Sequence, residues 1–211
     1  MNDHESLWSG VFGDEYTERN KTVDDWNIRA RESLFAEIFR LTQPSALNSI
    51  AEIGAGGGAN LVALRRLFGD RPRLIAVEPN ESARTQILSS CSTTAADVIN
   101  AWADALPFQD NSIDAVFTSG VLIHVAPNHL GAVMDEIHRV AGRYIICAEY
   151  FSPELRCIPY RGLGNALWAN DFGSAYLSRF EDLCSCDYGF AWRRATGLDN
   201  LTWHLMEKRP C

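Results

Sequence analysis

Short apolar runs alternate with amphipathic stretches along most of this chain. The runs of strand length are residues 49–53, 74–77, 99–103, 115–118 and 144–148, and helical periodicity is seen at 61–68, 81–90 and 127–140. Strands that alternate with helices in this way are typical of α/β proteins, in which helices pack on the faces of a sheet. The pattern therefore predicts a mostly parallel sheet with right-handed crossover connections.

The two ends of the chain differ from this pattern. Residues 1–20 carry aromatic side chains without a clear period, so we expect an irregular lead segment there. Asp24 or Asp25 can cap a helix that runs to about Leu41. Beyond Phe151 we expect an insert, a helix and an antiparallel hairpin that closes the sheet, at residues 152–164, 171–183, and 187–193 with 201–207.

The first apolar run ends in an acid and a glycine-rich turn. Glu52 is followed by Gly54, Gly56 and Gly58, and the helix at 61–68 comes next. Glycines in this place let the backbone turn sharply and approach a ligand closely. A turn of this kind, at the carboxyl end of a strand in an open α/β sheet, indicates a nucleotide-like cofactor site.

Two cofactors are compatible with this turn. Gly54, Gly56 and Ala59 satisfy the dinucleotide pattern G-x-G-x-x-A, which indicates a nicotinamide coenzyme. Glu52 together with Gly54, Gly56 and Gly58 fits acid-x-G-x-G-x-G, the form of an S-adenosylmethionine-binding loop. An acid directly before the glycines suits a ligand that carries an ammonium group, and it suits a pyrophosphate less well.

The residues after the turn favour S-adenosylmethionine. Glu78 ends the second apolar run, where it can accept hydrogen bonds from ribose hydroxyls, a contact that both cofactors need. Asp104 is followed by an apolar turn with Pro107 and by a fourth run that Asp114 leads. This layout is that of the adenine side in S-adenosylmethionine enzymes, and dinucleotide dehydrogenases show no such block.

Residues 50–149 resemble the class I S-adenosylmethionine-dependent methyltransferases. Within that superfamily the chain is similar to the pseudaminic-acid-biosynthesis-associated methylases. The narrower resemblance rests on residues 12–20 (FGDEYTERN), 120–127 (GVLIHVAP), 143–151 (RYIICAEYF), 160–162 (YRG), 171–172 (DF) and 188–190 (YGF). The resemblance implies a Rossmann-like α/β fold with a seven-stranded, mostly parallel sheet, an antiparallel last strand and helices on both faces.

We expect one domain, because 211 residues with 46% hydrophobic positions can bury a sufficient core. The resemblance implies three consecutive parts within it. They are an N-terminal lid and helix, a Rossmann-like core that binds the cofactor, and a substrate-side insert with the C-terminal hairpin, at residues 1–48, 49–151 and 152–211.

The resemblance also implies which residues form the site. Cofactor contacts are expected from Tyr16, Asn20, Glu52, Gly54, Ala55, Gly56, Gly58, Glu78, Pro79, Asp104, Ala105 and Ser119. Substrate contacts are expected from Arg19, Tyr150, Tyr160 and Arg161. Arginines from the lid and the insert would suit a carboxylate or phosphate-like group on the substrate.

Two residues are candidates for a catalytic base. His124 follows the fourth strand at the edge where the resemblance places methyl transfer, and a histidine titrates near neutrality. The alternative interpretation of His124 is a buried histidine that serves packing alone. Glu149 ends the fifth strand at the same edge, and it is the second candidate, as a base or as an acceptor of a substrate hydrogen bond.

Charge and composition exclude other functions. A net charge of −8 argues against nucleic acid, because phosphate binding depends on clusters of Lys and Arg. We expect no membrane span, since no apolar run approaches roughly 20 residues, and no secretory signal, since Met1 to Ser9 is polar and acidic. The six cysteines and five histidines show no metal-ligand spacing, so we expect no metal, free thiols and a cytoplasmic location.

The sequence thus predicts an S-adenosylmethionine-dependent methyltransferase that O-methylates a small polar metabolite, either sugar-like or bearing a carboxylate or phosphonate. The alternatives are a nicotinamide-dependent oxidoreductase, a methyltransferase for a protein or nitrogen acceptor, and a partner protein without catalytic activity. A protein without activity is disfavoured, because a degenerate site usually loses some of its residues, whereas this chain keeps Glu52, the glycines, Glu78 and Asp104. The sequence leaves the acceptor and the oligomeric state open.

Overall fold

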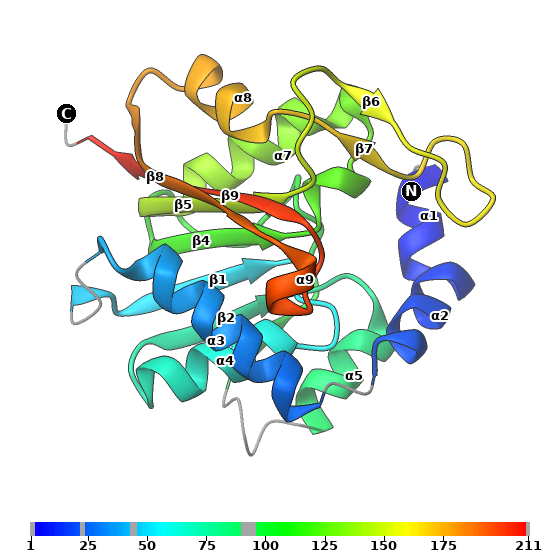
Figure 1. The fold of residues 1–211 in the computed structure, drawn as a ribbon, viewed down its shortest axis with the longest axis horizontal. Coiled ribbons are helices and arrows are strands. Elements are labelled where there is room, and N and C mark those ends of the chain that lie inside the picture. Colours follow the sequence, from blue (N-terminus) through cyan, green and yellow to red (C-terminus); the bar gives the residue numbers. More distant parts are fainter. Residues whose placement is uncertain (1–2, 22–23, 43–45, 90–95, 210–211) are drawn as a thin grey trace. The chain divides into compact units, whose positions relative to one another are not determined.

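The computed structural model describes residues 3–21, 24–42, 46–89 and 96–209. Its contacts divide the chain into two compact units, Met1–Ala103 and Asp104–Cys211. Figure 1 follows the chain from the blue helices of the first unit to the red strand that ends the second. Each unit contains part of the α/β pattern predicted from the sequence.

The first unit contains three parallel strands in the order β3-β2-β1. Its elements are α1 (Asp3–Ser9), α2 (Val11–Arg19), α3 (Asp25–Phe39), β1 (Ser49–Ile53), α4 (Ala59–Phe68), β2 (Arg73–Val77), α5 (Glu81–Ser89) and β3 (Asp97–Ile99). The strand predicted at residues 99–103 is wrong in its bounds, because β3 is shorter and starts two residues earlier. The register with β2 sets this position, and Arg73 Nε donates to Asp97 Oδ2 at 2.5 Å.

Helix α3 begins where the sequence predicts. The Asp24 side chain accepts a hydrogen bond of 2.8 Å from the backbone N–H of Asn27, which caps the helix. The buried face of α3 carries Ile28, Phe35, Ile38 and Phe39. The Phe39 ring meets that of Phe68 edge to face at 5.4 Å, so α3 is packed against α4.

The lead segment is helical, and the prediction of irregular structure for residues 1–20 is wrong. Trp8 meets Phe12 and Tyr16 edge to face, with ring centroids 5.3 and 5.5 Å apart. Helix α2 also packs against α5 (Figure 1). Because helices this short depend on tertiary contacts, their formation leaves little periodic signal in the sequence.

The second unit contains four strands in the order β4-β5-β9-β8. Its elements are β4 (Ile113–Ser119), the 3-10 turn η2 (Leu122–His124), α7 (Pro127–Val140), β5 (Ala141–Glu149), β6 (Arg156–Cys157), β7 (Trp168–Ala169), α8 (Phe172–Arg179), β8 (Leu183–Ala191), α9 (Arg193–Thr196) and β9 (Leu201–Lys208). Strands β4 and β5 are parallel, and β9 is antiparallel to both β5 and β8. Helices α7 and α8 pack against this sheet.

The insert after β5 forms a β-arm, residues 152–170, in which β6 pairs antiparallel with β7. At its tip the backbone N–H of Tyr160 donates to the Leu163 carbonyl at 3.0 Å, and the N–H of Leu163 donates back at 2.9 Å. Arg161 and Gly162 have φ angles of 49° and 81°. Two central residues with positive φ define a type I′ hairpin turn.

The prediction of the fold class is confirmed. Within the described residues, the first unit supplies three parallel strands, and the second supplies the parallel pair β4 and β5 with the antiparallel strands β9 and β8. Helices pack against the strands of each unit. The predicted elements other than β3 and the lead segment are present, with ends moved by a few residues. Across the part of the chain that the structure describes, no helix is long and apolar enough to cross a bilayer.

Candidate functional site

The glycine-rich turn after β1 folds back over the end of β2. The Val77 carbonyl accepts hydrogen bonds from the N–H groups of Gly54 and Ala55, at 2.8 and 3.1 Å. Gly54, Gly56 and Gly58 have φ angles of 73°, 51° and 83°, which only glycine adopts without strain. A Cβ added to Gly56 would have no atom within 4 Å, so open space adjoins the turn.

Glu78 is fixed to this turn by its side chain. One carboxylate oxygen accepts from the N–H of Gly56 at 2.8 Å, and the other accepts from the N–H of Asn80 at 2.9 Å. Burial raises the pKa of Glu78 above its usual value, although these two hydrogen bonds oppose the shift. Each carboxylate oxygen has a second lone pair, so Glu78 keeps the capacity to accept hydrogen bonds from ribose hydroxyls.

Glu52 lies buried in β1, with 1% of its surface exposed. Asn60 Nδ2 donates to Oε1 at 2.5 Å, and Arg31 Nη1 donates to Asn60 Oδ1 at 2.5 Å. Oε2 is buried and has no hydrogen-bond partner among the described residues. Burial, with a smaller effect from the nearby charge of Glu78, raises the pKa of Glu52 to about 8.

Asn80 connects four parts of the first unit, and the sequence analysis missed it. Its N–H donates to Glu78, and its Oδ1 accepts from the N–H of Ala83 at 2.8 Å, which caps α5. Its Nδ2 donates to Asp14 Oδ1 of α2 at 3.0 Å and to the Trp8 carbonyl at 3.2 Å. An asparagine directly before a helix is a cap signal that could have identified the residue.

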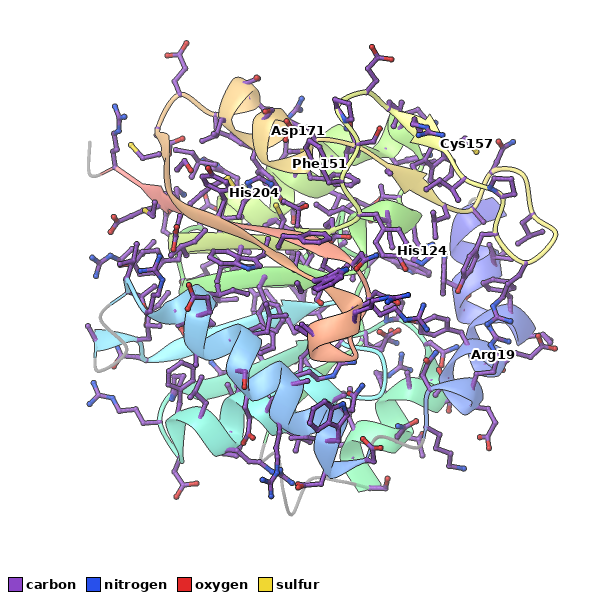
Figure 2. The ribbon with its side chains drawn as sticks, in the orientation of Figure 1. Arg19, His124, Phe151, Cys157, Asp171 and His204 are labelled. Atoms are coloured by element: carbon purple, nitrogen blue, oxygen red, sulfur yellow. The ribbon has the colours of Figure 1, made fainter. Side chains whose placement is uncertain are left out.

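The predicted lid residues lie at the end of α2. Arg19, labelled in Figure 2, is exposed and forms an ion pair with Glu15 at 3.6 Å. Asn20 ends the helix, and its side chain donates to the carbonyl of Tyr16 at 2.8 Å. Beside the strand end, the Pro79 carbonyl accepts from Arg84 Nη1 at 2.6 Å. The cofactor and substrate contacts of these residues stay predictions.

In the second unit, the ring of His124, labelled in Figure 2, contacts two residues of the β-arm. Nδ1 lies 2.7 Å from the Ala166 carbonyl oxygen, and the ring centroid is 5.2 Å from that of Tyr160. A carbonyl can only accept, so Nδ1 carries the hydrogen, and a neutral His124 has its lone pair on Nε2. This tautomer is the one that lets Nε2 receive a proton.

Glu149 lies beneath the turn that carries His124. Its two carboxylate oxygens accept from the N–H groups of Val121 and Ile123, at 3.2 and 3.3 Å. The residue is 2% exposed, and burial raises its pKa to about 7 although these hydrogen bonds oppose the shift. The structure therefore has Glu149 hold the η2 turn, and its predicted catalytic role stays a prediction.

The remaining predicted residues lie at several places in the second unit. Ser119 ends β4 and pairs with Ala148 of β5, close in sequence to the His124 turn. Arg161 is exposed at the tip of the β-arm, with its guanidinium 5.8 Å from the centre of the Tyr160 ring. Tyr150 donates its hydroxyl hydrogen to Asp199 Oδ2 at 3.0 Å. The edge after β4 and the β-arm thus bring Ser119, His124, Glu149, Tyr160 and Arg161 into one region.

Asp104 and Ala105 lie in a turn before Leu106. The turn is fastened to α7, because the N–H of Leu106 donates to Glu136 Oε2 at 2.8 Å and its carbonyl accepts from Arg139 Nη2 at 3.0 Å. A contact of Asp104 with adenine stays a prediction. Among the described residues, no group of three or more His, Cys, Asp or Glu side chains is arranged to hold a metal ion.

Comparison with known proteins gives one family match within the sequence. Residues 50–142 match the family model described as a methyltransferase domain. An uncharacterised methyltransferase of Mycolicibacterium gilvum (strain PYR-GCK) is 25% identical over 173 residues, which cover 79% of this chain. The aligned region spans 65% of the length of that relative.

Solved structures extend the likeness to nearly the whole chain. Magnesium protoporphyrin IX methyltransferase from Synechocystis PCC 6803, with bound S-adenosylmethionine, has a TM-score of 0.70 at 12% identity, covering 99% of this chain and 98% of that one. The 1,6-didemethyltoxoflavin-N1-methyltransferase of Burkholderia thailandensis, with bound S-adenosylhomocysteine, also scores 0.70 at 16% identity, covering 98% and 87%. The fold is therefore that of the S-adenosylmethionine-dependent methyltransferases. The matched methyltransferase domain at residues 50–142 agrees with the predicted class of enzyme, and the two solved structures that share the fold hold the predicted cofactor or its demethylated product.

Proposed function

We propose that the protein is an S-adenosylmethionine-dependent methyltransferase. The observation that carries this proposal is the pair of carboxylates, Glu52 and Glu78, at the ends of β1 and β2 beside the glycine turn. Both are buried, and the pKa of each is raised, so each charge lacks full compensation from the protein. A ligand that brings positive charge relieves this deficit, and one that brings a pyrophosphate increases it.

The residues present fit S-adenosylmethionine. Glu78 would accept hydrogen bonds from the ribose, and Glu52 would face the ammonium group with the oxygen that the protein leaves without a partner. The glycine turn leaves the space that the ligand backbone needs. By contrast, two buried acids of raised pKa disfavour the doubly charged pyrophosphate of a nicotinamide dinucleotide.

The second unit would supply the base. When bound, S-adenosylmethionine provides a methyl group that the positive sulfur already activates. The chain has to orient an acceptor and remove its proton, and His124 can take that proton at Nε2 while Nδ1–H remains bonded to Ala166. The Ala166 carbonyl then stabilises the imidazolium, and Glu149 keeps the turn in place. Orientation of the acceptor can contribute much of the rate.

For the acceptor we propose a hydroxyl of a small polar metabolite, sugar-like or bearing an acidic group. His124 and Tyr160 lie side by side, and the exposed Arg161 can pair with a carboxylate or phosphate-like group. The resemblance to the pseudaminic-acid-biosynthesis-associated methylases supports a sugar acid. In this proposal, residues 1–48 serve as the lid and helix, 49–151 as the cofactor part, and 152–211 as the substrate side.

Two measurements test the proposal. Calorimetry with S-adenosylhomocysteine and with NAD should show binding of the first alone, and the Glu52→Gln variant should bind it more weakly. Binding of NAD alone would contradict the cofactor assignment. Incubation with methyl-labelled S-adenosylmethionine and a panel of acidic sugars should then give a labelled methyl ether by mass spectrometry, and a methyl ester would show that a carboxylate is the acceptor. Label found only on a nitrogen or on protein would contradict the acceptor assignment and leave the cofactor assignment standing.

A further inference from the structure

Side chains from three elements of the first unit form a chain of hydrogen bonds that ends at Glu52. Asn60 lies in the first turn of α4, and its Nδ2 donates to Glu52 Oε1 of β1. Arg31 of α3 in turn donates from Nη1 to Asn60 Oδ1. Helices α3 and α4 pack against each other (Figure 1), which brings Arg31 to Asn60 across 29 positions of the sequence. We call Arg31 and Asn60 the relay.

The relay is largely shielded from water. Asn60 is 8% exposed, and Arg31 is half-buried. Arg31 Nε also donates to Asn27 Oδ1 one turn earlier in α3, at 2.8 Å, which fixes the direction of the guanidinium. Buried polar atoms in proteins nearly always have a hydrogen-bond partner. The second oxygen of Glu52, Oε2, has none among the described residues, so the network is complete only when a further group meets this oxygen.

The arginine determines the orientation of the Asn60 amide. A guanidinium can only donate, so the amide oxygen faces Arg31 and the amide nitrogen faces Glu52. Oε1 of Glu52 is therefore occupied as an acceptor. When the carboxyl is protonated, its hydrogen belongs on Oε2, the oxygen without a partner. A cation that meets Oε2 consequently replaces this hydrogen, and the carboxylate that it meets is already bonded on the other side.

The relay also affects the charge of Glu52. Burial raises the pKa of Glu52 to about 8, whereas the hydrogen bond from Asn60 and the positive charge of Arg31 oppose this rise. The negative charge of Glu78, which faces Glu52 from the end of β2, adds to the rise. Loss of either member of the relay should therefore raise the pKa of Glu52 further and make its ionised form more costly at neutral pH.

We propose that Arg31 and Asn60 are positioning residues for the cofactor, which act through Glu52 on the ammonium group of its amino-acid end. The relay leaves Oε2 for the ligand and favours the ionised carboxylate that the ammonium group requires. Neither residue has to touch the ligand. This inference rests on the proposed function, and it implies an effect that is limited to ligands with an ammonium group.

Two nucleosides separate this role from a structural one, because S-adenosylhomocysteine carries the amino-acid end and 5′-methylthioadenosine lacks it. In calorimetry, Arg31→Met should weaken the binding of S-adenosylhomocysteine by about fivefold at pH 7 and by about twofold at pH 8.5, where more of the carboxyl is ionised. Its affinity for 5′-methylthioadenosine should equal that of the wild type. The matched control is Arg29→Met, which changes an exposed arginine of α3 that pairs with Asp25 and should alter neither affinity. Equal weakening of both nucleosides by Arg31→Met overturns the proposal.

A double-variant cycle shows whether the relay acts through Glu52. In a Glu52→Gln protein the side chain at this position cannot ionise, so Arg31→Met and Asn60→Leu should each affect the binding of S-adenosylhomocysteine far less than they do in the wild type. Asn60→Leu interrupts the relay at a second point, so the cycle can be completed if one variant does not fold. An effect of the same size in both backgrounds overturns the proposal.

A measurement without ligand separates this inference from the proposed function. A wild-type protein that binds neither nucleoside contradicts the proposed function, and the relay is then judged from NMR titration of labelled glutamate carboxyls. The signal of Glu52 is identified by its loss in Glu52→Gln. Its titration midpoint should move upward by about half a pH unit or more in Arg31→Met, because the nearby positive charge is gone. A midpoint that does not move overturns the relay.

Discussion

One carboxylate oxygen of Glu78 accepts a hydrogen bond of 2.8 Å from the backbone N–H of Gly56. The acid at the end of β2 and the turn after β1 are therefore fixed to each other by the protein itself. The residue proposed to bind the ribose also maintains the shape of the turn. A change at Glu78 should consequently affect both the contact with the nucleoside and the surface that receives it.

Glu78→Ala should weaken the binding of S-adenosylhomocysteine by at least about tenfold. Hydrogen bonds to a charged group contribute about 1.5–3 kcal/mol, and the variant loses those to the ligand together with the one to the turn. Isothermal titration calorimetry measures the effect. Glu81→Ala, an exposed acid in the first turn of α5, is the matched control and should bind as the wild type does. An unchanged dissociation constant for Glu78→Ala would refute the assignment.

Binding of S-adenosylhomocysteine should release a proton from Glu52 near neutral pH. With a pKa of about 8 the carboxyl is mostly protonated at pH 7, and an ammonium group beside it would lower that pKa. The affinity should therefore rise by up to about tenfold between pH 7 and pH 8 and level off above that. Calorimetry in buffers of different ionisation enthalpy counts the proton. The Glu52→Gln variant should release fewer protons on binding than the wild type does. Equal proton release by both proteins would exclude Glu52 as the source of the proton.

Glu52 should also make the ligand-free protein less stable as the pH rises. Its pKa in the folded protein is about 8 against 4.5 for an unperturbed carboxyl, so the folded state binds more protons between these values. The free energy of unfolding then falls with rising pH, by at most about 1.4 kcal/mol per pH unit for this group. The pKa values of His138 and His204 are lowered by burial and act in the opposite direction. Thermal melts of the wild type and of Glu52→Gln are therefore compared at each pH, so that the histidine effects cancel. The stability of Glu52→Gln relative to that of the wild type should increase from pH 5 to pH 8.

His124→Ala should reduce turnover on the order of 10²- to 10⁴-fold, the range expected for the loss of a general base. The affinity for S-adenosylhomocysteine should remain within about twofold of wild type. Steady-state kinetics with an accepted substrate and calorimetry provide the two measurements. A protein that unfolds at lower temperature and binds the cofactor poorly would instead show that the histidine serves packing.

Asp14→Ala should release α2 from the start of α5. The variant loses the hydrogen bonds that Asp14 accepts from Asn80 and Ser82, at 3.0 and 2.8 Å, which hold α2 at the start of α5. Faster amide exchange in residues 11–19, measured by mass spectrometry, is the expected result, with a loss of about 1 kcal/mol in stability. Glu15→Ala changes a neighbouring exposed acid and should leave the exchange rates as they are. Equal exchange in Asp14→Ala and wild type would show that these bonds do not secure the helix.

Local patterns in the sequence revealed the strand-end acids and the glycine turn. Each of Glu52, Gly56 and Glu78 can be recognised from its near neighbours in the sequence. The two acids stand at the ends of apolar runs, and the glycine belongs to a turn whose glycines are regularly spaced. The structure adds that both acids are buried and bonded to the chain. Burial of this kind depends on packing between elements, so the raised pKa values were out of reach of the sequence.

The features that could not be predicted from the sequence depend on contacts between residues far apart in the chain. Asn80 reaches Asp14 over 66 positions, and Glu149 reaches Val121 over 28. The lead helices depend on such contacts, which is why residues 1–20 looked irregular. Glu149 shows the same limit, because its place after β5 indicated a site residue and gave no sign that backbone amides occupy both its oxygens.

Under the proposed function, the two-residue turn at Arg161 and Gly162 limits how the protein could change its methyl acceptor. Adding or removing one residue in so tight a hairpin would alter the turn type and rotate Tyr160 to the opposite face of the β-arm. The ring would then leave its position 5.2 Å from His124. New acceptor preferences should therefore arise by exchange of side chains on a β-arm of constant length, and insertions should be found nearer its base.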